Sequence, residues 1–258
     1  MAVPSTFAQG IDLSRWNGRY DPHKKPVDFV ILKASEGLAY RDPGFIQLLS
    51  DAAPVPIKGA YHYYRSGVPW RAQADNFLAA IAGTGIHLAA LDYEHINNTL
   101  NAATDQEARK FIEYIEQQGY KCLIYLQKSL YDQMLARGAT WLLSADVWIA
   151  RWFEKNYYYN RATSPGMENW RCWQYGGDYR HPTNGWVVPG YKEGAAYGVQ
   201  NDSIDLNAYN GTLEDMIAWL GADVTAPDEP EEPPEAQPLT LEERVDRAEQ
   251  LFREHGWL

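Results

Sequence analysis

The sequence predicts an α/β fold in which a parallel sheet closes into a barrel with helices packed outside it. Two observations carry this prediction. Strand-like runs alternate with helix-like segments through the first half of the chain, and such alternation is typical of parallel sheets. In the second half, three further strand-like runs follow one another with little helix between them, so we expect the barrel to be irregular there.

Eight segments have the composition and length of strands, being rich in β-branched and aromatic residues and bounded by turn residues. In chain order they are residues 8–14, 28–35, 57–64, 88–94, 121–126, 145–151, 170–175 and 203–209.

Five segments follow the helical period of 3.6 residues or carry helix start and stop signals. They are residues 42–53, 69–85, 104–119, 129–138 and 212–221. Asp42 is the expected N-cap of the first helix, with Pro43 at its first position. Thr104, with Glu107 three residues later, predicts a capping box for the third.

The composition divides the chain into a barrel of residues 1–222, an acidic Pro-rich linker of residues 223–239 and a C-terminal amphipathic helix of residues 240–258. Of the net charge of −11, −8 falls in residues 223–258, where 11 acids accompany 3 bases. The barrel therefore has no basic stripe that could follow a phosphate backbone, and we expect no nucleic-acid partner. The helix has a short heptad stripe, which predicts a homo-oligomer; docking on the barrel or a lone helix are the alternatives.

The N-terminal residues "MAVPSTFAQG" lack the basic start and apolar stretch of a signal peptide, and nowhere do 18 apolar residues run together. We therefore expect synthesis in the cytoplasm and no membrane insertion. Cys122 and Cys172 lie in strand-like surroundings, so buried free thiols are expected rather than a disulfide. No metal-ligand spacing and no Gly-rich phosphate loop occurs, which predicts no metal and no cofactor.

The stretch "LAALDYEHI" ends a buried strand with two acids, Asp92 and Glu94. Residues i and i+2 of a strand face the same side, with Cα atoms about 6.5–7 Å apart. In a β/α barrel the C-terminal ends of the strands form the face that carries active sites. Repulsion between two carboxylates raises the pKa of one of them, as a general acid requires. For an isolated pair of this kind, a solvated loop or an ion pair is the alternative.

Polar and aromatic residues also end the other predicted strands. Asp12 ends the first and Asp205 lies in the last, and these two strands are neighbours in a closed barrel. Carboxylates among aromatic residues are typical of glycoside hydrolysis. Packing inside the barrel is the alternative for the residues expected to contact sugar, which are Tyr61, Tyr125, Trp148 and Gln174.

Five motifs, "GIDLSRWNG", "FVILKASEG", "GAYHYYR", "LDYEH" and "IDLNAYNG", occur in this order. Together they resemble glycoside hydrolase family 25, the Chalaropsis-type lysozymes that include many phage endolysins, over about residues 7–221. The resemblance implies an irregular TIM-like (β/α)5(β)3 barrel that cleaves the β-1,4 bond between N-acetylmuramic acid and N-acetylglucosamine in bacterial peptidoglycan. It also implies that Glu94 is the general acid, with Asp92, Asp12 and Asp205 around it.

Several roles stay open at this level. Asp92 could stabilise the oxocarbenium-like charge, orient an N-acetyl group that acts as nucleophile, or itself be the nucleophile. Asp12 and Asp205 could hold the hydrogen bonds of the pocket or cap their own turns. Lys33 and Glu36 are expected to balance charge at the barrel mouth. His62 is expected to be structural.

The alternative to a muramidase is a protein that has the same barrel and binds its ligand without catalysis. A cell-wall carbohydrate-binding protein would keep the aromatic residues but would not need the acid pair. A muramidase made without a signal peptide would act on the wall after phage-type lysis or non-classical export.

Overall fold

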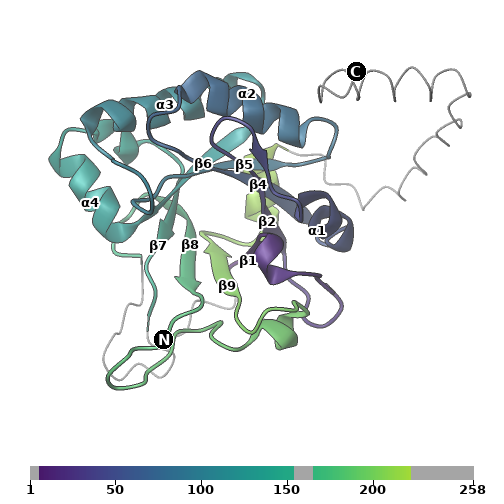
Figure 1. Cartoon of the computed structure of the whole chain (residues 1–258). Helices are drawn as coiled ribbons and strands as arrows, with labels where there is room; N and C mark the ends of the chain where they lie inside the picture. Colours follow the sequence, from purple (N-terminus) through teal and green to yellow (C-terminus); the bar gives the residue numbers. More distant parts are fainter. Residues whose placement is uncertain (1–5, 154–164, 222–258) are drawn as a thin grey trace, which may run out of the picture. The chain divides into compact units, whose positions relative to one another are not determined.

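The computed structural model describes residues 6–153 and 165–221 (Figure 1). By its internal contacts the chain divides into one unit of residues Met1–Val224 and a second of residues Thr225–Leu258. The predicted linker (223–239), the C-terminal helix (240–258) and the oligomer built on that helix lie outside the described residues, and they stay predictions.

Eight strands close into a barrel because β1 pairs with both β2 and β9. Neighbouring barrel strands from β1 to β8 are parallel, whereas β9 runs antiparallel to β8 and to β1. One further short strand, β3, lies outside the barrel and pairs antiparallel with the end of β2. The strands are β1 Gln9–Leu13, β2 Phe29–Glu36, β3 Tyr40–Arg41, β4 Ile57–Tyr63, β5 Leu88–Asp92, β6 Lys121–Gln127, β7 Val147–Ala150, β8 Trp170–Gly176 and β9 Asp205–Tyr209. The predicted irregular α/β barrel is confirmed.

All five helices predicted for the barrel are present, and α2, α3 and α4 lie along the outside of the sheet (Figure 1). No helix among the described residues is both long enough and apolar enough to span a bilayer. The helices are α1 Phe45–Asp51, α2 Trp70–Ile81, α3 Ala102–Gln117, α4 Lys128–Ala136 and α5 Leu213–Leu220, and 3-10 turns occur at Arg15–Asn17, Thr140–Leu143 and Gly194–Tyr197.

Two predicted helix starts were wrong. The first helix begins at Phe45 after an N-cap at Gly44, because Pro43 and Gly44 form a turn in which the Phe45 N–H donates to the Asp42 carbonyl at 3.1 Å. The Asp42 side chain accepts the backbone N–H groups of Arg15 and Gly44. The third begins at Ala102 with Asn101 as its N-cap. Asn caps as well as Thr does, and here it lies three residues earlier.

Thr104 is therefore the reciprocal partner at the third position of the α3 capping box, and its hydroxyl accepts the Asn101 N–H. Glu107, the partner that we predicted, instead accepts a hydrogen bond from the Tyr64 hydroxyl at 2.6 Å. The α3 start is thus tied to the segment that follows β4.

Apolar side chains form two layers, one between sheet and helices and one inside the barrel. The inner layer contains Phe29, Leu88 and Met216 of α5, and it fills the end of the barrel where the parallel strands begin. The opposite end is left for polar groups. Cys122 belongs to the outer layer and Cys172 to the inner one, so they lie on opposite faces of the sheet and are free, buried thiols as predicted.

Candidate active site

The acid pair lies at the C-terminal end of β5. The strand ends at Asp92, two residues earlier than predicted, but the alternation of faces continues through Glu94. Between them Tyr93 is fully buried on the helix side, where its hydroxyl donates to Asp105 Oδ1 at 2.8 Å. Anchoring Tyr93 outward turns both neighbouring carboxyl groups inward.

One cavity of about 110 Å³ lies at this end of the barrel, inside the ring of strand ends. It is lined by the eight residues predicted to act in catalysis or to contact sugar: Asp12, Tyr61, Asp92, Glu94, Tyr125, Trp148, Gln174 and Asp205. They come from seven strands and one loop position, and closure of the barrel brings them together. Their roles in catalysis or sugar binding stay predictions.

Asp12 is the most extensively hydrogen-bonded acid of the cavity. Its Oδ2 accepts from Gln174 Nε2 at 2.9 Å and from Asn207 Nδ2 at 2.8 Å. The register of the antiparallel pair places Asp12 directly opposite Asp205. Asp12 therefore holds hydrogen bonds across the barrel, and it does not cap a local turn.

The aromatic residues of the cavity belong to the same network. Tyr125 donates its hydroxyl to Gln174 Oε1 at 2.9 Å, and Trp148 donates its indole N–H to Asn207 Oδ1 at 2.8 Å. Trp148 is only 2% exposed, so its main contacts are with the barrel interior and not with solvent. These side chains fix the two amides that bind Asp12.

Two residues of this network were missed in the sequence, Asn207 and Trp152, whose indole N–H also donates to Gln174 Oε1 at 3.0 Å. The signal for Asn207 was present, because it lies two residues after Asp205 in one strand and must share its face. Nothing in the sequence around Trp152 indicated its direction.

Burial raises the pKa of both Asp92 and Glu94. At Asp92 the charge of Glu94 and a hydrogen bond shared with Glu94 add to this rise. The cation of Lys33 opposes the rise for both. A hydrogen bond between two carboxyl groups needs one proton, so the pair keeps a proton to higher pH than a free carboxyl group does.

The pKa values of the other two acids, Asp12 and Asp205, are also raised. Burial raises the pKa of Asp12 to about 6, against the hydrogen bonds from Asn207 and Gln174. Burial and the nearby Asp12 raise the pKa of Asp205 well above its ordinary value. The cavity thus concentrates four acids that resist full ionisation.

Replacing Asp12 by Asn is expected to flatten the pH dependence of stability. A carboxyl group with pKa 3.8 when unfolded and about 6 when folded stabilises the fold below pH 3.8, and this stability is lost as the pH rises through 6. The loss is roughly 3 kcal/mol at 1.36 kcal/mol per pKa unit. Asn can still accept from Gln174 and Asn207. Urea unfolding between pH 4 and 8 should therefore show a decline that is roughly 3 kcal/mol smaller in Asp12→Asn than in the wild type, because the other buried acids contribute equally to both. Identical declines would contradict the assignment.

A β-bulge in β2 sets the direction of the side chains at the mouth of the cavity. The pairing with β4 shifts between Lys33 and Ser35, so Ala34 and Ser35 both lie on the helix side. The alternation resumes one residue late, and Glu36 comes to the same side as Lys33, whose Nζ lies 2.7 Å from Glu36 Oε2. Bulges beside active sites commonly redirect a side chain in this way.

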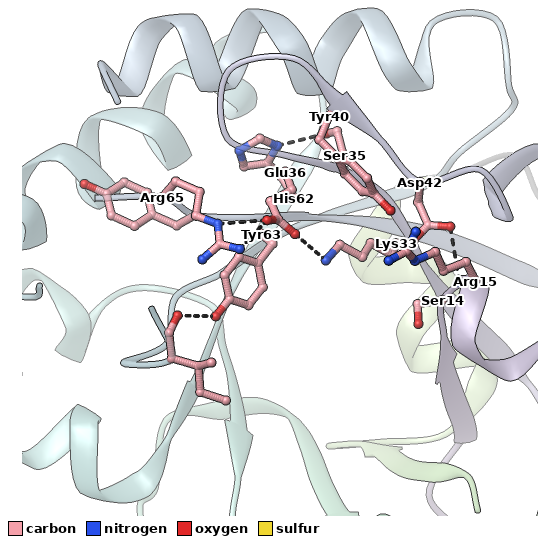
Figure 2. A network of polar contacts seen from close by, with 12 residues as sticks. Ser14, Arg15, Lys33, Ser35, Glu36, Tyr40, Asp42, His62, Tyr63 and Arg65 are labelled. Atoms are coloured by element: carbon pink, nitrogen blue, oxygen red, sulfur yellow. Dashed lines mark hydrogen bonds and ion pairs between the residues drawn. The ribbon is translucent and has the colours of Figure 1, made fainter. Parts of the chain in front are cut away.

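His62 supports this bulge from the helix side (Figure 2). Its Nδ1 lies 2.8 Å from Ser35 Oγ and its Nε2 lies 3.2 Å from Gln73 Oε1. The amide of Gln73 donates to two backbone carbonyls, so its oxygen must accept from the imidazole. Burial lowers the pKa of His62 to about 3. His62 is thus a neutral structural residue, as expected.

Gly177 leaves room for the Asp205 carboxylate. A Cβ added there would lie 2.3 Å from Asp205 Oδ1 and 2.7 Å from Trp152 Cζ2. Gly177→Ala is therefore expected to displace the carboxylate and to lower activity about 10- to 100-fold. Assays of Gly177→Ala beside the wild type check this. Equal activity of the two proteins would show that the position of Asp205 does not matter.

The described residues, 6–153 and 165–221, contain no group of three or more His, Cys, Asp or Glu side chains arranged to hold a metal ion.

Residues 11–183 match the model of a family described as glycosyl hydrolases family 25. An uncharacterized protein of Escherichia coli K12, YegX, is 28% identical over 231 residues, covering 84% of this chain and 75% of that protein. The autolytic lysozyme of Clostridium acetobutylicum is 30% identical over 135 residues, covering 49% of this chain and 40% of the lysozyme.

Among solved structures, a family 25 glycosyl hydrolase from Bacillus anthracis superposes with a TM-score of 0.61 at 21% identity. The match covers 84% of this chain and 94% of that one. At this identity the likeness concerns the fold, and it agrees with the barrel described above.

Proposed function

Because the chain belongs to glycosyl hydrolases family 25, we propose that it is a lysozyme-type muramidase. Its substrate is the β-1,4 bond between N-acetylmuramic acid and N-acetylglucosamine in bacterial peptidoglycan. The observation that carries the proposal is the Asp92–Glu94 pair, which retains a proton in a cavity at the C-terminal face of a family 25 barrel. The similarity to an autolytic lysozyme supports it.

Glu94 is proposed as the general acid. It lies beyond the strand end, partly exposed to the cavity, whereas Asp92 is only 7% exposed. The proton of the pair passes from Glu94 to the leaving oxygen as the glycosidic bond breaks, and positive charge develops on the muramic acid ring. Glu94, now a carboxylate, takes a proton from the incoming water, so the enzyme returns to its starting state.

Asp92 is proposed to stabilise this charge and to orient the N-acetyl group of the substrate. Asp92 shares a hydrogen bond with Glu94, so one of its oxygens is engaged with the general acid itself. Asp92 Oδ1 is buried and accepts no hydrogen bond from the described residues. An amide N–H of the substrate would satisfy it.

The test is digestion of purified peptidoglycan by the full chain, followed by reduction and mass spectrometry of the fragments. We expect new reducing ends at muramic acid with the wild type and about 10²- to 10⁴-fold slower release of them with Glu94→Gln. Glu113→Gln, which removes an exposed, ion-paired carboxylate of α3, is the matched control and should cleave normally. Binding to the wall without fragments from any of the three proteins would reject the muramidase and favour the carbohydrate-binding alternative. Arrival at the wall by phage-type lysis or non-classical export stays a prediction.

A further inference from the structure

A second cavity, of about 440 Å³, is lined by Lys33, Glu36 and Arg65, whose ion pairs Figure 2 shows, together with neighbouring residues. We call it the basic groove; its main side chains are those of Arg15, Trp16, Lys33, Tyr40, Tyr63 and Arg65. Tyr63 lies two residues after Tyr61 of the acid cavity, on the same face of β4. Lys33 acts on the pKa of both Asp92 and Glu94. The two cavities are therefore neighbours, and a substrate in one can reach the other.

The groove carries an excess of positive charge in a chain whose net charge is −11. Of its three cations, Lys33 and Arg65 share one carboxylate, Glu36, at 2.7 Å and 2.8 Å. Their hydrogen bonds hold the pKa of Glu36 below its usual range, although burial opposes this. The second carboxylate, Asp42, accepts from backbone N–H groups.

Arg15 is the cation that is available for a ligand. Its guanidinium lies 4.3 Å from the centre of the Trp16 ring and 5.8 Å from that of Tyr40. Within residues 6–153 and 165–221, no carboxylate oxygen forms an ion pair with it. A stacked guanidinium keeps its N–H fork free, and that fork matches the geometry of a carboxylate.

The rim of the groove is apolar and open. Trp16 is 72% exposed, Ile96 60% and Tyr40 37%. A ligand that suits the groove therefore combines carboxylates with small apolar groups. The sugar rings of peptidoglycan carry no charge once the lactyl group is amide-linked, whereas the peptide stem on that lactyl group carries carboxylates and alanine methyl groups.

We propose that the basic groove binds the peptide stem of a muramic acid residue at the cleavage site, with Arg15 pairing a stem carboxylate. This proposal rests on the muramidase function and specifies which part of the substrate, beyond the glycan, the protein recognises. Arg15 acts here in substrate binding and takes no part in the bond cleavage.

The experiment compares two soluble substrates: glycan strands that carry peptide stems, and the same strands after an amidase has removed the stems. Wild-type kcat/KM is expected to be about tenfold higher on the stem-bearing strands, the worth of one hydrogen bond to a charged group. Arg15→Gln should lose this preference while cleaving bare strands as the wild type does. Arg71→Gln, which removes an exposed ion-paired cation of α2, should keep the preference.

The outcomes separate the two proposals. Equal wild-type kcat/KM on both substrates, or an Arg15→Gln variant that slows both equally, overturns stem recognition and leaves the muramidase intact. No cleavage of either strand by the wild type rejects the muramidase, and stem recognition with it. A preference that shrinks as salt is raised supports an ionic contact at this exposed site.

Discussion

Replacing Glu94 by Gln is expected to lower kcat on peptidoglycan about 10²- to 10⁴-fold, the usual contribution of a general acid. Gln has nearly the same shape but no proton to give, and KM should change little because the sugar contacts remain. Initial rates of reducing-end release over a range of substrate concentrations measure both constants. A kcat within threefold of the wild type would remove Glu94 from the role of acid.

The pH profile of the wild type provides a second readout of the same residue. Because the pKa values of Asp92 and Glu94 are raised, activity should persist above the pH at which a free carboxyl group loses its proton, and it should decline as the pair ionises. The residual activity of Glu94→Gln should lack this alkaline decline. If the decline survives the substitution, another group supplies the proton.

Replacing Asp105 by Ala is expected to cost about 4 kcal/mol of folding free energy and also to lower activity. Asp105 is 1% exposed and accepts from Arg137 Nε at 2.5 Å, from Arg137 Nη2 at 2.8 Å and from the Tyr93 hydroxyl at 2.8 Å. Alanine would leave the Arg137 charge and the Tyr93 hydroxyl without this partner. Since Tyr93 separates Asp92 from Glu94, loosening it disturbs both acids.

Urea denaturation gives the stability of Asp105→Ala, and rates measured far below its midpoint give the activity of the folded form. Glu113→Ala is the control, because an exposed pair on the same helix, here with Arg109, is worth only about 0.3–0.5 kcal/mol. A loss below 1 kcal/mol for Asp105→Ala would contradict the anchoring role of this residue.

The sequence predicted the barrel and its strands well because the parallel strands are buried and nearly all apolar, and such runs are easily recognised. It predicted the helix starts less well, since Asn101 and Thr104 both carry capping side chains and only the folded chain selects between them. No pattern in the sequence indicates the bulge at Ala34 and Ser35. Without the bulge, residues three apart in a strand face opposite sides, so the sequence could not show that Lys33 and Glu36 lie on the same side.

The lining of the acid cavity was predictable because strand ends meet at one face of a barrel. The hydrogen bonds among these residues were not predictable. Tyr125, Trp148 and Gln174 are expected to contact sugar, which stays a prediction, and hydrogen bonds also join them to the network around Asp12. Those contacts depend on residues far apart in the sequence, and a single sequence carries no signal for such pairing.

The antiparallel closure of the barrel by β9 also determines at which stage of chain synthesis the site can form. Asp12 receives a hydrogen bond from Asn207, which lies 195 residues away in the sequence, and it faces Asp205 across the last pair of strands. Contacts of such long range form late, because their loop-closure entropy must be overcome first. A nascent chain that has left the ribosome only as far as β8 holds Asp92 and Glu94 but lacks the acid and the amide of β9. The acid cavity is therefore completed only near the end of synthesis of the barrel.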